Sequence, residues 1–365
     1  MKRSASASTL ARARIDAHRQ QSRVRAGALI VSVFGDAVAP RGGRLWVGSL
    51  IRLLQPLGID ERLVRTAVSR LAKQAWLRIE PHGRRADYLL TEAGQRRFEE
   101  ASRTIYAARP RAWDGRWRLL LLVRELDAKA REPLRRALAW QGFGQLGADC
   151  FVHPGADLDE TLQALATEGL TDAPAQLLPL LAVDARHGLG QSDADLVRRA
   201  WNLDERAQAY ADFDTGYRPL WQALGAAGGG DLAPEDAFLL RTLLIHDWRR
   251  LLLRDPELPD VLLPAGWPGR AARQLTRELY QRLLAPSERH LDALLQRADG
   301  QALPPPDAAS RQRFGGPRSA AGGASAQPAS TVSACPRPRP SACTTGGTAA
   351  RSAAASVGGR LLSLW

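Results

Sequence analysis

Residues 46–77 read WVGSLIRLLQPLGIDERLVRTAVSRLAKQAWL, and this stretch decides the fold of the first part of the chain. Its apolar spacing predicts one helix from about Trp46 to Leu54. A proline and a glycine then stop that helix, because neither residue suits a helix interior. Asp60 is a suitable N-cap, so a further helix is expected over Glu61–Ala75.

The helix expected at Glu61–Ala75 has two chemically different faces. At about 100° per residue, one arc collects side chains that can donate hydrogen bonds: Arg62, Arg65, Thr66, Ser69 and Lys73. The opposite arc is aliphatic: Leu63, Val64, Ala67, Val68, Leu71 and Ala75. One face would pack on a domain while the other meets phosphates and base edges in a DNA major groove. An amphipathic surface helix that meets only water would show the same pattern.

The neighbouring segments extend this pattern into a domain expected over residues 23–108. A first helix is expected over Val24–Phe34. Two short strands follow the third helix, at Trp76–Ile79 and Tyr88–Leu90, and a further helix begins near Thr91. Three helices and then a hairpin is the element order of a winged helix-turn-helix domain.

Basic side chains lie where such a domain meets nucleic acid. Arg84 and Arg85 are in the turn between the two strands, and Arg41 and Arg44 precede the second helix. We expect the two wing arginines to contact DNA phosphates, and Arg41 and Arg44 to contact the phosphate backbone nearby. An ordinary basic surface loop would leave Arg41 and Arg44 without that role.

The net charge of +13 is unevenly distributed along the 365 residues. Residues 1–100 carry 19 basic and 9 acidic groups, residues 101–300 carry 25 and 28, and residues 301–365 carry 7 and 1. All but three of the basic residues are Arg, which suits phosphates and base edges, although a GC-rich gene would also favour Arg. The distribution predicts a basic binding module fused to a neutral body.

The composition also excludes several classes of protein. No stretch reaches the roughly 20 apolar residues of a membrane span. The N-terminus lacks the apolar core of a secretory signal, although its acid-poor, Arg-rich start also fits a transit peptide. Three cysteines, Cys150, Cys335 and Cys343, are too few to cross-link a chain of this length. We therefore expect a cytoplasmic protein with no membrane partner.

Four further runs join residues 46–77 in a family resemblance: YLLTEAG at 88–94, WDGRWRLLLL at 113–122, LLIHDWRRLLLRD at 243–255 and LLPAGW at 262–267. Together they resemble the PaaX family of bacterial repressors of phenylacetate catabolism, over about residues 23–295. The resemblance implies a homodimeric repressor that binds operator DNA and is released by phenylacetyl-coenzyme A. We expect no enzymatic activity, no catalytic residue, no metal and no cofactor.

Residues 109–190 are expected to form a central domain with the ferredoxin-like fold. The predicted order is β-α-β-β-α-β, at Arg116–Val123, Lys129–Trp140, Gly142–Leu146, Asp149–His153, Leu158–Glu168 and Gln176–Val183. The resemblance agrees, because the central part of these repressors is similar to the small ferredoxin-like nucleases of the CRISPR system.

The rest of this α+β, multidomain chain divides into a helical domain and two less regular ends. Residues 191–298 are expected to hold the effector and the dimer interface, and they show four helical patterns: Leu196–Phe213, Tyr217–Leu224, Pro234–Leu253 and Arg270–Leu284. Residues 1–22 predict a flexible basic arm. Residues 299–365, rich in Pro, Ala, Ser and Gly, predict a disordered low-complexity tail, and a genuine extension and a frameshifted reading would look alike.

The run His246-Asp247-Trp248-Arg249-Arg250 places ionisable groups on an otherwise apolar helix, where each needs a partner. One explanation is an internal network of ion pairs between helices. The other is an effector site for an acyl-coenzyme A, with arginines on the phosphates and aromatic rings around the aryl group. The candidate effector residues are His246, Trp248, Arg249, Arg250, Arg254, Trp201, Tyr217 and Trp221.

Three other hypotheses stay open at this point. A regulator of the same class could respond to a different aromatic compound or acyl-coenzyme A. A metal-dependent nuclease would use the ferredoxin-like domain, with Asp127 as a metal-binding acid. A protein–protein adaptor would use the winged helix without salt-dependent DNA binding. Cys150 and His153 do not predict a structural zinc site, because such a site needs four ligands.

Overall fold

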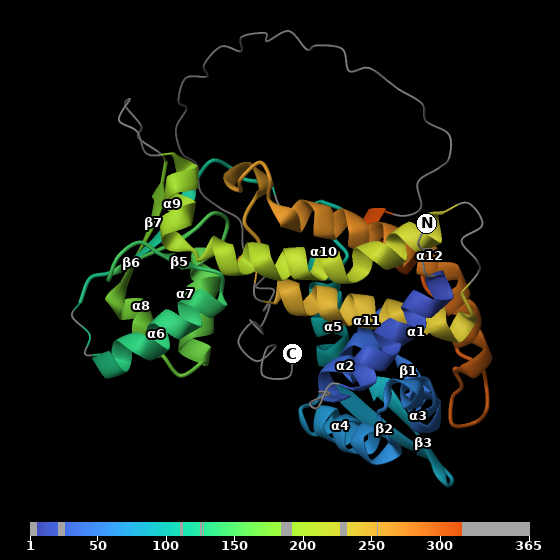
Figure 1. The fold of residues 1–365 in the computed structure, drawn as a ribbon. Helices are drawn as coiled ribbons and strands as arrows, with labels where there is room; N and C mark the ends of the chain where they lie inside the picture. Colours follow the sequence, from blue (N-terminus) through green and yellow to red (C-terminus); the bar gives the residue numbers. More distant parts are fainter. Residues whose placement is uncertain are drawn as a thin grey trace, which may run out of the picture.

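A computed structural model describes residues 6–20, 26–109, 112–124, 126, 128–183, 192–226, 232–253 and 255–315. Helices and two small sheets build three regions that follow one another along the chain (Figure 1). The N-terminal region and the central sheet lie at different ends of a layer of long helices from the C-terminal region (Figure 1). Within the described residues, no helix combines the length and the apolar character that spanning a membrane requires.

The N-terminal region has the α-helices and strands that the sequence predicts, with one added strand and three short helical turns. Its elements are α2 (Ala26–Val33), η1 (Phe34–Val38), η2 (Ala39–Arg41), β1 (Arg44–Trp46), α3 (Val47–Leu54), η3 (Gln55–Leu57), α4 (Glu61–Lys73), β2 (Leu77–His82), β3 (Arg85–Leu90) and α5 (Glu92–Ile105). The added strand is β1, which pairs with β3 in an antiparallel sheet of order β1-β3-β2. The first helix does not end at Gly35, because a turn of π-helix continues it to Val38.

The core of this region explains why α4 lies where it does. The Asp60 side chain accepts a hydrogen bond of 2.7 Å from the backbone N–H of Leu63, which fixes the start of α4. Val64 and Val68 are then buried among the apolar side chains of α2 and α3, such as Leu50. The apolar stripe of α4 therefore turns its polar stripe outward.

The central region contains the predicted elements in the predicted order, with one extra short helix. They are β4 (Trp117–Leu122), α6 (Ala128–Trp140), β5 (Gly144–Gln145), β6 (Cys150–His153), α7 (Leu158–Thr167), α8 (Ala173–Gln176) and β7 (Leu177–Ala182). The strands form one sheet of order β5-β6-β4-β7, and every neighbouring pair is antiparallel. Leu120, Phe151 and Leu165 are buried between this sheet and its helices.

The C-terminal region is a helical layer made of α9 (Asp193–Ala200), α10 (Leu203–Gly225), α11 (Pro234–Leu252), η4 (Asp260–Leu262) and α12 (Pro268–Leu294). Several boundaries differ from the expectation, and α12 continues past the expected end at Leu284 to Leu294. The helix expected over Leu196–Phe213 is interrupted at Trp201 and Asn202, which separate α9 from α10. From Leu203 on, α10 continues through Pro219 to Gly225 as one helix. Because α11 packs against α1, α2, α5, α10 and α12, it is the central element of the molecule (Figure 1).

The expected flexible arm at residues 1–22 is wrong for its described part. Residues 7–19 form helix α1 (Ala7–Arg19), whose N-cap Ser6 accepts a hydrogen bond from Thr9. Ala11 and Ile15 are buried, and α1 packs against α10 and α11. Ala7, Ala11 and Ile15 recur at four-residue spacing and form the buried face of α1. Residues 1–5, 21 and 22 lie outside the described residues.

The beginning of the expected disordered tail is also ordered. Residues 299–315 include α13 (Ala308–Arg311) and η5 (Arg313–Gly315), and they run back over the N-terminal region. The backbone N–H of Asp307 donates to the carbonyl of Pro40, and the Phe314 ring is fully buried. The remainder of that expected tail, residues 316–365, lies outside the described residues.

The buried Asp36 carboxylate contacts side chains from α11, α12, the end of α5 and the segment 299–315. Its carboxylate lies 2.7 Å from Nε of Arg241 on α11 and 3.0 Å from Nη1 of Arg313. The hydroxyls of Tyr106 and Tyr280 donate to the same carboxylate, at 2.6 and 3.0 Å. Burial by itself raises the pKa of Asp36, but the two guanidinium groups outweigh it and hold the pKa below its usual value. The carboxylate is therefore ionised, and two arginines from the C-terminal part of the chain neutralise it.

We expect Asp36→Asn to lower the free energy of unfolding by roughly 3–5 kcal/mol, because it leaves two buried cations without this partner. Urea unfolding of the full-length chain measures the change. Glu132→Gln is the control, since Glu132 pairs with Arg135 and Arg136 on the exposed side of α6 and should cost less than about 1 kcal/mol. Similar losses for the two variants would contradict the account.

The same carboxylate should make the protein acid-sensitive. Because the folded-state pKa of Asp36 is depressed, its stabilisation is present above the unfolded-state value of about 3.9 and is lost as the pH falls through the folded-state pKa. The difference in unfolding free energy between wild type and Asp36→Asn should therefore shrink below about pH 4. A difference independent of pH would contradict this sign.

Candidate nucleic-acid interface and effector site

The polar face of α4 is exposed as the sequence predicts. Arg62, Arg65, Thr66, Ser69 and Lys73 are all exposed, and Val64, Ala67, Val68 and Leu71 are buried behind them. Two members of the expected apolar arc differ. Leu63 is 44% exposed at the start of the helix, and Ala75 lies beyond its end with a left-handed φ of 59°.

Local contacts hold the donors of α4 in place without burying them. Nε of Arg65 lies 2.7 Å from Oε1 of Glu61 one turn earlier, and the Thr66 hydroxyl donates to the carbonyl of Arg62. The Arg65–Glu61 pair is exposed on both sides, so it contributes little stability and can be exchanged for another acceptor. These contacts within α4 leave its guanidinium groups accessible.

The hairpin of β2 and β3 carries the second basic element of this surface. His82 pairs with Arg85, which leaves Gly83 and Arg84 as a two-residue turn, and Gly83 has the left-handed φ of 57° that such a turn favours. Arg84 is exposed at the tip. The guanidinium of Arg85 stacks over the Trp46 ring at 4.6 Å, which holds the hairpin against β1 close to its turn.

The expectation of a phosphate contact is wrong for Arg41, which the structure buries. Its Nη2 pairs with the carboxylates of Glu288 and Asp292 on α12, and Nη1 donates to the carbonyl of Pro304. An arginine with both ends of its fork engaged and 2% of its side chain exposed is not available to DNA. Arg41 instead connects the N-terminal region to the C-terminal helix.

Arg44 is likewise committed inside its own sheet. Its Nε lies 2.7 Å from Oδ2 of Asp87, a fully buried carboxylate on β3, and Nη2 lies 3.0 Å from Glu80 on β2. The other oxygen of Asp87 accepts the backbone N–H of Ala298. Arg44 thus joins the three strands and does not fit the expected role at the phosphate backbone.

The predicted effector residues of α11 are core residues. His246, Trp248 and Arg249 are buried. The Trp248 ring N–H donates to the carbonyl of Ile105, and the Arg249 guanidinium donates to the carbonyl of Ala28. These contacts correct the expectation of a ligand site here, because the polar groups join α11 to α5 and α2.

The other predicted effector residues do not converge on one cavity. The Tyr217 hydroxyl donates to Asp247 while Arg14 covers the ring, and the Trp201 ring N–H donates to the carbonyl of Gly142 in the central region. Trp221 donates to Glu278 on α12. Arg250 is exposed, away from these rings, and Arg254 lies outside the described residues.

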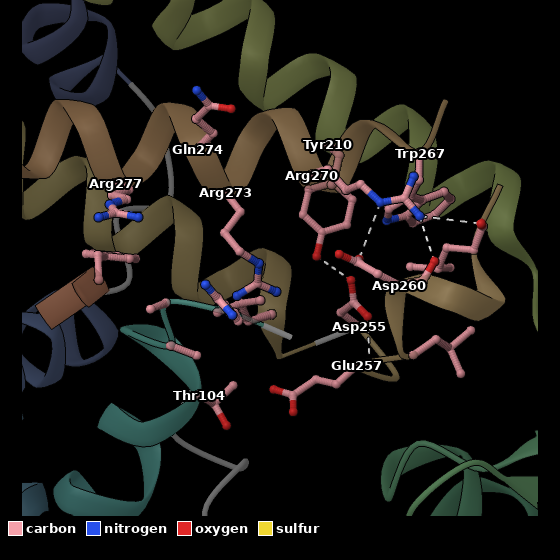
Figure 2. A pocket seen from close by; sticks show the side chains of 18 of the residues that line it. Thr104, Tyr210, Asp255, Glu257, Asp260, Trp267, Arg270, Arg273, Gln274 and Arg277 are labelled. Carbon is pink, nitrogen blue, oxygen red and sulfur yellow. Dashed lines mark hydrogen bonds and ion pairs between the residues drawn. The ribbon is translucent and has the colours of Figure 1, made fainter. Parts of the chain in front are cut away.

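Sequence reasoning missed a cleft of about 810 Å³ between the end of α5, the segment 255–267 and α12. Figure 2 shows Arg273 and Arg277 on α12 with Tyr210 and Trp267 nearby, and Thr104 of α5 below them. Arg270, Arg273 and Arg277 recur at helical spacing, which was visible in the sequence. That spacing alone is typical of a solvated helix face, so nothing in it indicates the opposite wall.

No group of three or more His, Cys, Asp or Glu side chains that could hold a metal ion occurs among the described residues. Cys150 is a free thiol on β6, and the neighbouring His153 ring accepts the backbone N–H of Gly155. Asp127, the acid considered for a nuclease, lies outside the described part of the chain.

His246 should make the fold sensitive to mild acid. Burial lowers the pKa of His246 well below its usual value, and the cations Arg249 and Arg250 lower it further. The unfolded chain then binds a proton that the folded chain refuses, so stability should fall as the pH drops below about 6.5. His246→Asn should flatten the stability profile between about pH 7 and pH 5, measured by urea unfolding. An unchanged slope would contradict the assignment.

Comparison with known proteins places all three regions. Family models match residues 25–94 as "PaaX-like protein", residues 110–179 as "PaaX protein central Cas2-like domain" and residues 201–293 as "PaaX-like protein C-terminal domain". The chain is 40% identical over 291 residues to the "Transcriptional repressor PaaX" of Escherichia coli (strain K12), covering 79% of this chain and 89% of that protein. Among solved structures, the uncharacterized protein Rv0674 from Mycobacterium tuberculosis matches at 26% identity and a TM-score of 0.43, over 66% of this chain and 88% of the other. The chain therefore belongs to the PaaX-like protein family.

Proposed function

We propose that this protein is a DNA-binding transcriptional repressor that acts through the N-terminal region as a winged helix-turn-helix domain. The observation that carries the proposal is the exposed row of donors on α4, Arg62, Arg65, Thr66, Ser69 and Lys73, beside the exposed Arg84 of the hairpin. The relative in Escherichia coli, named a transcriptional repressor, supports the same role.

The buried face of α4 determines how it would meet DNA. Because Val64, Val68 and Leu71 fix the helix on the domain, its opposite face is free to enter a major groove. Arg62 and Arg65, near the N-terminal end, would meet base edges, and Lys73 and Arg84 would meet phosphates. Two copies of the domain in a homodimer would bind a palindromic operator in the cytoplasm.

The remaining regions would supply regulation. In this proposal the central region has the ferredoxin-like fold and, with the C-terminal helices, responds to an effector that weakens operator binding. The effector we propose is phenylacetyl-coenzyme A, and a different aromatic compound or acyl-coenzyme A is the alternative within the same class. By linkage, an effector that weakens DNA binding must itself bind the DNA complex less tightly. No described residue favours the nuclease hypothesis.

We expect Arg65→Ala to weaken binding to the promoter of its own operon by about 1–3 kcal/mol if Arg65 contacts a base edge. Gel-shift titration against operator and random DNA measures this. Equal losses on both DNAs would make Arg65 a phosphate contact. Arg136→Ala, which removes an exposed arginine paired with Glu132 on α6, is the control and should bind like wild type.

Glu61→Gln distinguishes base contact from a structural role of Arg65. It removes the carboxylate that Arg65 contacts but keeps the guanidinium, so operator binding should be retained or strengthened. Loss of binding in Glu61→Gln similar to that in Arg65→Ala would show that the ion pair within the helix is what matters.

Phenylacetyl-coenzyme A should abolish the shifted band on the promoter DNA, and free phenylacetate should not. The contrast follows because only the thioester carries the phosphate groups that a cationic site recognises. A band that resists phenylacetyl-coenzyme A but disappears with another acyl-coenzyme A would favour the alternative effector. Absence of any salt-dependent DNA binding would overturn the repressor proposal.

A further inference from the structure

The cleft beside α12 is unusually rich in cations. Six arginines line it: Arg103, Arg109, Arg270, Arg273, Arg277 and Arg282. Only four carboxylates face the same space: Asp255, Glu257, Asp260 and Glu278. The volume of about 810 Å³ falls within the range of roughly 300–1,000 Å³ that ligand sites occupy.

Most of the acidic groups already have partners within the wall of the cleft. Asp260 lies within ion-pair distance of Arg270, whose guanidinium also donates to backbone carbonyls of the 260–265 segment. The Tyr210 hydroxyl donates to Asp255. Glu278 accepts hydrogen bonds from the Trp221 ring N–H and from Gln274. Three of the four carboxylates are therefore engaged within the wall of the cleft.

Because Arg270 is engaged as described and Arg282 donates to the carbonyl of Trp221, four arginines are left facing the cleft. Arg273 and Arg277 are half-buried on α12, and Arg103 and Arg109 are exposed near the end of α5. Within the described residues, none of the four has an ion pair or a hydrogen bond to a side chain. The guanidinium of Arg273 is held 5.5 Å from the centre of the Trp248 ring, and it extends toward the segment that contains Asp255 and Glu257 (Figure 2).

We propose that this cleft is a binding site for a ligand with two or more phosphate groups. Arg273 and Arg277 lie one helical turn apart, about 6 Å along the axis, so their planar forks can hold adjoining phosphates with two hydrogen bonds each. Arg103 supplies a third cation from the opposite wall. Trp267, Leu258 and Leu263 provide the apolar lining for the uncharged part of the ligand.

The walls of the cleft also touch the elements that neutralise Asp36. Phe314 lines the cleft and adjoins Arg313, and Ala107 lines it next to Tyr106, whose hydroxyl donates to Asp36. A ligand that moves either wall would therefore act on the contact between the C-terminal layer and the N-terminal region. This regulatory step rests on the proposed function, and the binding site itself does not.

Titration calorimetry of the full-length chain with coenzyme A tests the site without DNA. Coenzyme A carries three phosphate groups, and pantetheine, its phosphate-free fragment, is the matched probe. Arg273→Gln combined with Arg277→Gln should weaken coenzyme A binding at least tenfold. Arg289→Gln, an exposed arginine of α12 outside the cleft, should bind like wild type. Pantetheine should bind much more weakly than coenzyme A to every variant.

Arg273→Lys guards against a merely structural effect. Lysine keeps the charge but loses the fork, so its affinity for coenzyme A should fall between wild type and the double variant. The urea unfolding midpoint should be the same in all variants, which shows that they are folded. Equal affinity of wild type and double variant for coenzyme A, or no binding to wild type, overturns the site.

The same variants separate this inference from the proposed function. If the double variant loses coenzyme A but the wild type never binds operator DNA, the site stands and the repressor proposal fails. If the wild type binds operator DNA and phenylacetyl-coenzyme A releases it equally from the double variant, the repressor proposal stands and the site is overturned.

Discussion

The neutralisation of Asp36 is the constraint on which the arrangement of the molecule depends. A buried carboxylate is costly unless cations and hydrogen-bond donors surround it. Here Arg241 comes from α11, Arg313 from the last described segment and Tyr106 from the end of α5. The N-terminal region, which carries the exposed donors of α4, is therefore attached to the C-terminal helices by charge as well as by apolar packing.

The sequence was sufficient to predict those elements whose determining contacts are local. The exposed face of α4 and the hairpin were predictable, since a period of 3.6 residues and a turn glycine depend on neighbours in the chain. Arg41 and Arg44 were misplaced for the opposite reason. The partner of Arg41, Glu288, is 247 residues away, and a basic residue in a loop looks the same whether or not a distant carboxylate awaits it. The order in residues 299–315 was missed because few apolar side chains there, such as Phe314, carry the packing.

The residues predicted to bind an effector also depend on contacts that the sequence does not reveal. His246 and Arg249 were conspicuous because they interrupt an apolar helix, yet their partners Ser32 and Ala28 make them part of the core. Arg273 and Arg277 were inconspicuous because arginines on a helix usually face water. What makes them notable is the second wall supplied by α5 and the segment after α11, and no periodicity within α12 encodes that wall.

The separation of Asp36 from its cations has a consequence for synthesis on the ribosome. Asp36 and Arg241 are 205 residues apart, and Arg313 follows later still. At about 5–20 residues per second, Asp36 leaves the exit tunnel roughly 10–40 s before Arg241 does. During that interval the Asp36 carboxylate has neither of the arginines that neutralise it in the folded protein. The contacts that neutralise Asp36 are therefore completed only after Arg313 has been synthesised, so the N-terminal region docks late.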